Sequence, residues 1–501
     1  MGAPPVPPAR LMRSIIEATV AAPNAAAHAC RCAVAVPSSG SVPVSATPAG
    51  GLTDPAAAGL RRGLPGSADG TMRYVIRPPV AAVAIRWRRA VRPVVPGADR
   101  PVWQVLVSAV LAPCLLAALL VVPWLVLAAP REVCATDALQ AKALAGLANF
   151  SGWLRRNRAA GFIGEVGWPA GKDSAAWNAL AETWYTAADQ IGLPVTAWAA
   201  GSWPADYPMA IYRPDPGSPG ALTPGPQAAV LQHHPSTVHY LRGVTLAAGS
   251  FAAGDTNGSF GGGNPGHYGR DYGYEAGSTY RDLAGRGVRL VRLAVTWERL
   301  QPVPFGPLSH DELARVRAAL DEADRANLAV LVDLHGYGYF AAGGGRHGEL
   351  RRRTLGSPDL PTTALADFWS RMAIALAHAP AVTGLGILNE PTHLAAGGRA
   401  GARIWERASQ QSVDAIRRTG STAAVTVSGY MPMNPLAWGE MHPTGWIHDP
   451  RHRVAYESHA YFDTDSTGYY DSSYPEELRR AARTAPDRCQ WLAPVEHHDV
   501  L

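Results

Sequence analysis

Eight apolar runs of strand length recur along the sequence beyond residue 135, and amphipathic stretches separate most of them. The runs are 161–168, 194–201, 241–247, 288–295, 328–335, 382–390, 423–430 and 454–461. The amphipathic stretches lie at about 173–191, 275–286, 309–326, 361–379 and 400–419. Strands that are apolar throughout are typical of parallel sheets covered by helices. Eight such strand–helix units predict an α/β fold of the (β/α)8 TIM-barrel type.

The chain has 501 residues, and its composition divides it into five parts. Residues 1–101 are rich in Ala, Pro, Val, Gly and Ser, which predicts a disordered arm that cannot bury enough apolar surface to fold. Residues 102–129 carry no charge and are long enough to span a bilayer. Residues 135–213 hold the first two strands, 214–238 read as a linker, and 239–501 hold the other six strands.

A cluster of arginines stands before the uncharged run, at positions Arg86, Arg88, Arg89, Arg92 and Arg100. The positive-inside rule then places the arm in the cytoplasm and the barrel outside the cell, on a single-pass membrane anchor. A signal peptide beginning near Met72 and cleaved near 128–129 is the alternative, and it would make the barrel a secreted domain.

The overall charge of +5 and a sequence pI of about 9.0 do not predict nucleic-acid binding, because no basic stripe stands out beyond the arginine cluster. Five cysteines are too few for a disulfide scaffold.

Polar and aromatic side chains that can reach a sugar stand toward the C-terminal ends of the apolar runs, where catalytic groups of such barrels lie. They are Glu165, Trp198, Arg292, His335, Asn389, Glu390, His459 and Tyr461. Two of them are glutamates on different strands. Two facing carboxylates are what glycoside hydrolysis requires, one to protonate the leaving oxygen and the other to attack the anomeric carbon or activate water.

These residues and their surrounding strings, such as GFIGEVGWP, DLHG, ILNEP and SHAY, resemble glycoside hydrolase family 5, the cellulase-like retaining β-glycanases. The resemblance covers about 136–501. It implies that Glu390 is the acid/base and Glu165 the nucleophile. It also implies that Arg292 and Tyr461 orient the nucleophile and that Trp198 stacks under the sugar at the cleavage point. His335, Asn389 and His459 match the family's substrate-binding positions.

The order of the strings departs from the family. The look-alikes of strands seven and eight, with Glu165 and Trp198, come first, and strands one to six follow. We therefore expect a circularly permuted barrel whose new ends lie near the helix at 137–157 and its predecessor at 475–485. Barrels tolerate such a change because their natural termini lie close together. Cys134 and Cys489 fall near the two new ends and are expected to form a disulfide.

Two alternatives remain open. Glu496, in WLAPVEHHDVL, could instead be the nucleophile of an unpermuted, truncated barrel. The chain could also be a catalytically inactive carbohydrate-binding or cell-envelope scaffold built on a glycosidase barrel. The favoured hypothesis is an endo-β-glucanase-like enzyme that acts on a β-linked oligo- or polysaccharide by a two-glutamate double displacement, with no metal or organic cofactor.

Overall fold

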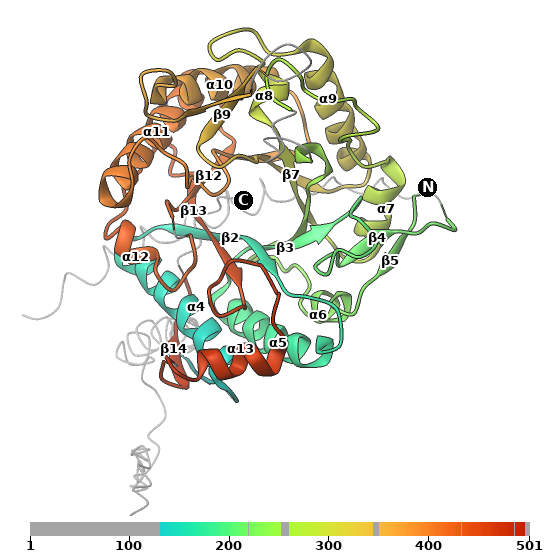
Figure 1. Ribbon diagram of the computed structural model, residues 1–501, viewed down its shortest axis with the longest axis vertical. Helices are drawn as coiled ribbons and strands as arrows, with labels where there is room; N and C mark the ends of the chain where they lie inside the picture. The colour runs from blue at the N-terminus through green and yellow to red at the C-terminus, as the bar shows by residue number, and fades with distance from the viewer. Residues whose placement is uncertain are drawn as a thin grey trace, which may run out of the picture. The chain divides into compact units, whose positions relative to one another are not determined.

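Eight parallel strands form a closed barrel with helices around it (Figure 1). The computed structural model describes residues 131–501 except for 219, 252–259, 344–349, 432, 485 and 496–501. The barrel strands are β2 (Ala160–Gly167), β3 (Val195–Ala200), β6 (Arg242–Leu246), β7 (Leu290–Val295), β8 (Ala329–Leu334), β11 (Val382–Gly386), β12 (Ala424–Ser428) and β13 (Val454–Tyr461). Each pairs with the next in parallel, and β13 pairs with β2 to close the ring.

Helices cover the outer face of most of these strands. The longer ones are α4 (Ala138–Asn157), α5 (Ser174–Ile191), α7 (Gly277–Gly285), α9 (His310–Arg325), α10 (Thr362–Ala375), α11 (Gly398–Arg418) and α13 (Tyr474–Ala481). Helix α9 illustrates how the sequence determines where these helices begin and which face they bury. Its N-cap Ser309 accepts from the backbone amide of Glu312, and Val316, Leu320 and Ala323 recur at helical spacing on its buried face.

Alternation along the strands sends one set of side chains outward, against the helices, and the other set into the barrel. Phe162, Leu290, Leu331, Ala424 and Ala455 form an apolar cluster of their own, separate from the large cluster that includes the helices. Two residues later on the inward face, four of these strands carry a polar side chain, namely Arg292, Asp333, Thr426 and Glu457, whereas β2 has Gly164. The barrel interior is therefore apolar where the strands begin and polar where they end.

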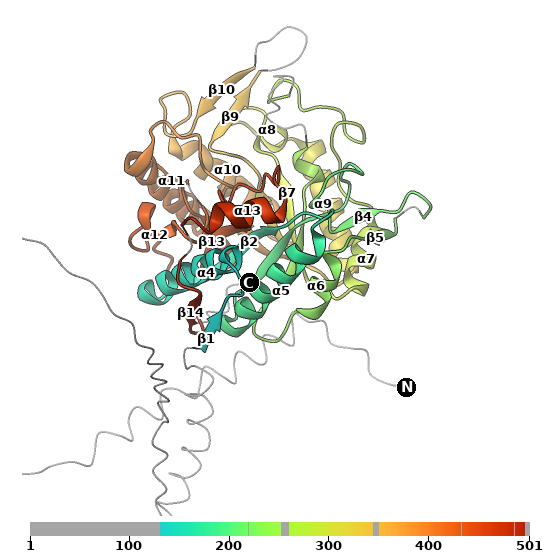
Figure 2. The same ribbon diagram turned by 60° about the horizontal axis from the view of Figure 1, so that its bottom comes forward.

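A two-stranded ribbon joins the start and the end of the described chain. Strand β1 (Arg131–Cys134) pairs antiparallel with β14 (Cys489–Leu492), and Cys134 and Cys489 form a disulfide. The predicted disulfide is thus confirmed. The ribbon lies against α4 and α5 (Figure 2), and beyond β14 the amide of Val495 donates to the carbonyl of Ile191, the last residue of α5.

Shorter elements lie between the barrel units. They are β4 (Tyr212–Pro214), β5 (Leu222–Pro224), α6 (Ala228–His233), η1 (Ala248–Ser250), α8 (Trp297–Leu300), β9 (Tyr339–Ala342), β10 (Arg351–Thr354) and α12 (Trp438–Met441).

The sequence predicted the barrel and all eight strands, but two local predictions differ from the structure. Strand β11 ends at Gly386 and not at 390, so the residues that follow it reach the cleft as irregular backbone. The segment 214–238, expected to be a plain linker, contains β5, which pairs with β4, and the helix α6. The Pro and Gly residues of this segment are typical of turns and linkers, so a prediction from composition misses its short strands and helix.

No helix in the described part of the chain is long and apolar enough to cross a bilayer. The predicted arm at 1–101 and the predicted span at 102–129 lie outside the described residues, as does Glu496.

Candidate active site

The predicted site residues meet where the barrel strands end. Glu165 lies on β2, Trp198 on β3, Arg292 on β7, and His459 and Tyr461 on β13, whereas His335 follows β8, and Asn389 and Glu390 follow β11. Arg292, Glu457, His459 and Tyr461 share the inward face with the apolar layer beneath them, because they are an even number of residues from Leu290 and Ala455. The strand register therefore gathers residues that lie far apart in the sequence.

Glu165 is buried, and each of its carboxylate oxygens has a hydrogen-bond donor. Arg292 Nη1 donates to Oε1 at 2.8 Å, and the hydroxyl of Tyr461 donates to Oε2 at 2.5 Å. Burial, together with the negative charges of Glu165 and Glu390, raises the pKa of Tyr461 well above its ordinary value. The phenol therefore stays neutral and keeps its proton for Glu165. Both contacts fix the plane of the Glu165 carboxylate.

Arg292 is fully buried and is surrounded by acceptors. Its Nη2 lies 3.0 Å from Asp333 Oδ1, 3.0 Å from Glu457 Oε1 and 2.7 Å from Asn389 Oδ1. Burial alone would lower the pKa of Arg292, but the surrounding carboxylates raise it, so the guanidinium stays charged. A buried cation needs such partners to offset its lost hydration.

Asp333 and Glu457 are therefore part of the site, although sequence reasoning did not single them out. Their signal was present: each is the one acidic residue inside a buried strand, in AVLVDL for Asp333 and in VAYESHAY for Glu457. Such residues are rarely buried unless they are paired.

Space for the Glu457 side chain comes from a glycine on the neighbouring strand. A Cβ atom placed on Gly164 would lie 1.9 Å from Glu457 Oε1. The hydroxyl of Thr426 donates to the other oxygen of Glu457 at 2.7 Å. Burial alone would raise the pKa of Glu457, but Arg292 and His459 hold it well below its usual range.

Glu390 reaches the same place from the loop after β11. Its backbone has φ 41°, in the left-handed region that costs a residue other than glycine on the order of 1 kcal/mol, and such positions gather at functional sites. The side chain is 32% exposed, whereas that of Glu165 is 4% exposed. Glu390 thus faces the solvent side of the site and Glu165 lies deeper.

His459 stands between the two glutamates. Its Nδ1 lies 2.8 Å from Glu390 Oε1 and 3.4 Å from Glu165 Oε2, and its Nε2 lies 3.4 Å from Glu457 Oε1. Burial alone would lower the pKa of His459, but Glu165, Glu390 and Glu457 raise it to about 10. In turn, burial alone would raise the pKa of Glu390, but its hydrogen bond to His459 and the histidine's charge lower it. At neutral pH the pair is an imidazolium and a carboxylate.

Trp198, from β3, and His335, which follows β8 beside β11, pack against each other in the site. Their rings are stacked with centroids 5.5 Å apart and an angle of 12° between planes. His335 Nδ1 lies 3.0 Å from Asp333 Oδ2, which connects this pair to the cluster around Arg292. The structure thus brings all eight predicted residues into one connected network.

Two groups of described side chains have donor atoms close enough to hold a metal ion. One consists of Glu165, Glu390 and His459, whose donor atoms all lie within 4.8 Å of one another. The other is Glu132 with Cys134 and Cys489, but both sulfurs are in the disulfide. In the first group a cation would have to displace the proton of His459.

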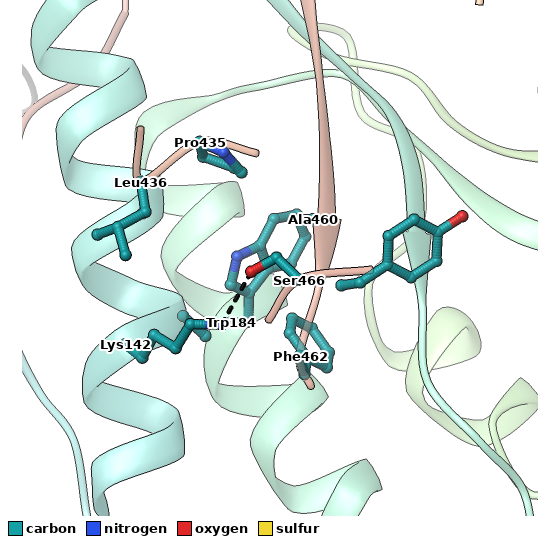
Figure 3. Close-up of a pocket in the computed structure, with 10 residues that line it drawn as sticks. Lys142, Trp184, Pro435, Leu436, Ala460, Phe462 and Ser466 are labelled. Carbon is teal, nitrogen blue, oxygen red and sulfur yellow. Dashed lines mark hydrogen bonds between the residues drawn. The ribbon is translucent and has the colours of Figure 1, made fainter. Parts of the chain in front are cut away.

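A small pocket beside β13 shares Tyr461 with this site and is otherwise lined by other residues. Trp184, Leu436 and Phe462 give it apolar walls, and Lys142 reaches into it from α4 (Figure 3). Lys142 Nζ donates to the hydroxyl of Ser466 at 2.8 Å and to the carbonyl of Asp463 at 2.7 Å. The lysine thereby ties the loop after β13 to α4.

Comparisons with known proteins give one family match and several related sequences. Residues 253–489 match the profile of the cellulase family, glycosyl hydrolase family 5. A probable endo-beta-1,4-glucanase B of Neosartorya fischeri is 23% identical over 231 residues, which are 46% of this chain and 63% of that protein. Endo-beta-1,4-glucanase B of Aspergillus niger is 24% identical over 244 residues, 48% of this chain and 67% of that protein. The chain thus spans about two thirds of the length of these relatives.

Solved structures give similar matches. The endoglucanase Cel5A of Pseudomonas stutzeri, in complex with cellobiose, is 30% identical over 46% of this chain and 62% of that chain, with a TM-score of 0.39. The endo-beta-1,4-glucanase Xac0029 of Xanthomonas axonopodis pv. citri is 32% identical over 48% of this chain and 72% of that chain, with a TM-score of 0.38. The fold assignment rests on the strand pairing and not on these superpositions.

The family match and the curated relatives show that this chain resembles glycoside hydrolase family 5.

Proposed function

We propose that the protein is a retaining β-glycoside hydrolase of the endo-β-1,4-glucanase type. The observation that carries this proposal is the proximity of the two glutamates: an oxygen of Glu165 and an oxygen of Glu390 lie within 4.8 Å of each other. Carboxyl groups about 5–5.5 Å apart are typical of retaining glycosidases, whereas inverting enzymes need roughly 6.5–9.5 Å to admit a water.

In this proposal Glu165 attacks the anomeric carbon while the bond to the leaving oxygen breaks and Glu390 protonates that oxygen. Water then attacks the anomeric carbon of the glycosyl-enzyme, Glu390 takes its proton, and Glu165 leaves. Arg292 and Tyr461 each bind one oxygen of Glu165 and hold it in the attacking orientation. Preorganised donors of this kind need no rearrangement at the moment of reaction.

The proton for the leaving oxygen has a defined origin in this arrangement. Glu390 has a lowered pKa and is ionised at rest, whereas His459 holds a proton 2.8 Å from its oxygen. We assign His459 the role of holding that proton until Glu390 delivers it. When Glu165 loses its negative charge to the glycosyl bond, one of the charges that favour the imidazolium disappears.

Asn389, His335 and Trp198 are proposed to bind the sugar at the cleavage point. Asn389 is held by Arg292 at 2.7 Å, and Trp198 presents a flat aromatic surface that is stacked on His335. An amide beside the acid/base suits a sugar 2-hydroxyl, where contacts strengthen in the transition state.

We also propose that the barrel is circularly permuted relative to the family. The matched segment, 253–489, begins after β2 and β3, and these two strands carry Glu165 and Trp198. The disulfide between β1 and β14 joins the ends that this permutation would create.

For localisation we propose a membrane-anchored or secreted extracytoplasmic domain, on the basis of the uncharged run at 102–129 and the arginines before it. Fractionation of cells that express the full chain tests this. Recovery in the membrane fraction after a carbonate wash supports the anchor, and a processed chain in the medium supports secretion. Full-length protein in the cytosol refutes both.

The catalytic proposal is tested with wild type, Glu390→Gln and Glu165→Gln on soluble β-1,4-glucan and on an aryl β-cellobioside. We expect wild type to release reducing ends with retention of the anomeric configuration by NMR. Each variant should lose roughly 10³-fold or more in turnover, as expected when a group essential to the chemistry is removed. Cello-oligosaccharide binding by the wild type without turnover would favour the inactive scaffold, and an inverted product would refute the retaining mechanism.

A further inference from the structure

The loop that follows β13, residues 462–473, begins with a tight turn around a buried carboxylate. Asp463 is 2% exposed. One of its oxygens accepts from the amide and from the hydroxyl of Thr467, both at 2.8 Å, and the other accepts from the amide of Gly468 at 3.0 Å. The carbonyl of Asp463 accepts from the amide of Ser466 at 3.0 Å. The turn at 463–468 therefore has one preset shape.

This turn and the end of β2 both contact the ring of Tyr461. A Cβ atom placed on Gly167, the last residue of β2, would lie 2.9 Å from Tyr461 Cε1, and one placed on Gly468 would lie 3.0 Å from the same atom. The hydroxyl of Tyr470 accepts from the amide of Phe462 at 2.8 Å and donates to the carbonyl of Gly167 at 2.6 Å. The two glycines are thus held together beside the ring, and a shift of the turn would move the ring with it.

Lys142 holds the turn from another part of the barrel. It lies on α4, and its ammonium donates to the carbonyl of Asp463 and to the hydroxyl of Ser466, which is 324 residues away in the sequence (Figure 3). Burial lowers the pKa of Lys142, whereas the negative charge of Asp463 and of two further carboxylates raises it. A lysine can make both contacts because its compact ammonium has three donors on a flexible stem.

We infer that Lys142 is a positioning residue for Tyr461 and, through it, for the proposed nucleophile Glu165. The lysine fixes the turn at 463–468, and the turn fixes the ring. The hydroxyl of that ring donates to Glu165 Oε2 at 2.5 Å. The inference rests on the proposed function and adds to it a residue that does not touch the substrate. Its effect on the rate is expected because a hydrogen bond weakens steeply when its geometry is lost, and small displacements near reacting groups are costly.

A double-mutant cycle with Tyr461→Phe tests the inference on an aryl β-cellobioside. Lys142→Met keeps an unbranched apolar stem in the pocket but donates to neither oxygen. It should lower kcat roughly 3- to 10-fold in the wild type, with KM changed by less than about twofold. In the Tyr461→Phe background it should lower kcat by less than about 1.5-fold, because no hydroxyl remains to be misplaced.

Lys172→Met is the matched control, since Lys172 is the other lysine of the chain and is exposed in the segment after β2. It should leave kcat unchanged in both backgrounds. Equal losses for Lys142→Met in the two backgrounds would overturn the inference, because a lysine that only supports the fold affects both alike. An unchanged kcat in Lys142→Met would also overturn it.

A second variant covers the case in which Lys142→Met does not fold. Ser466→Ala removes one of the two acceptors and should lower kcat about two- to threefold in the wild type, but not in Tyr461→Phe. If the wild type turns over no substrate, the proposed function fails, and the cycle of Lys142→Met and Tyr461→Phe is measured by urea denaturation instead. A cost of Tyr461→Phe that falls by about half or more in Lys142→Met supports the positioning role, and additive costs refute it.

Discussion

Substitution of Glu457 by glutamine isolates the effect of one buried charge on the proposed proton-holding residue. Glu165, Glu390 and Glu457 together raise the pKa of His459 from 6.5 to about 10. One of three such charges accounts for roughly one pKa unit, on the order of 1.4 kcal/mol. Glutamine has the same shape. With its amide oxygen toward Arg292 and His459, its NH2 group can donate to the Thr426 hydroxyl, so the Glu457→Gln variant should keep its packing and lower the pKa of His459 to roughly 9.

The sign of the effect on stability follows from linkage. Because the pKa of His459 is raised in the folded state, its stabilising contribution is complete below about pH 6.5 and is lost as pH rises toward 10. In the Glu457→Gln variant the stabilising contribution of His459 should be lost at a pH about one unit lower than in the wild type. The alkaline limb of the kcat/KM profile should move to lower pH by the same amount.

The assay is a pH–rate profile together with urea denaturation between pH 6 and 10. Asp449→Asn is the control, because Asp449 forms an ion pair with Arg417 at 2.8 Å and does not contact the two glutamates. It should cost stability without moving the profile. An unchanged alkaline limb in a stably folded Glu457→Gln would refute the assignment of the proton to His459.

Three further changes test other parts of the structure. Tyr461→Phe removes a hydrogen bond to the buried carboxylate of the proposed nucleophile, worth about 1.5–3 kcal/mol, and should lower kcat/KM on an aryl β-cellobioside roughly 10- to 100-fold. Unchanged turnover would contradict its orienting role. Gly164→Ala places a methyl group against a buried carboxylate and should cost roughly 1–3 kcal/mol in urea denaturation. Gly285→Ala, which meets no atom within 4 Å, should be nearly neutral, and equal losses for the two would refute the steric argument. Replacing Cys134 and Cys489 by serine opens a link across a sequence separation of 355 residues and should lower stability by on the order of 5 kcal/mol, seen as a lower melting temperature. An unchanged melting temperature would show that the ribbon holds without its disulfide.

The sequence was sufficient to predict the barrel because buried strands appear in it as apolar runs, and polar residues stand where those runs end. Glu165 and Glu390 could be found in this way, because each interrupts or follows an apolar run. The roles of Asp333 and Glu457 as ion-pair partners of Arg292 could not be assigned, since a buried ion cluster depends on the register between strands. Only the paired strands show that Arg292 needs acceptors beyond Glu165.

Local structure in the segment after β3 was also beyond sequence reasoning. Helix α6 and the β4–β5 pair lie in a stretch whose Pro and Gly residues suggest a plain linker. Tyr207, whose hydroxyl accepts a hydrogen bond from the Trp198 indole, has no sequence signal of its own. Its importance comes from one indole hydrogen bond and one stacked ring, and both arise only when the segment folds back on β3.

The ribbon of β1 and β14 lies far from the candidate site along the barrel. Arg131 pairs with Leu492, and Val495 binds the end of α5, four residues before β3 begins. The ribbon therefore lies at the end of the barrel where the strands start, whereas both glutamates lie where the strands finish. A molecule that binds at the two glutamates therefore approaches from the end of the barrel opposite the disulfide.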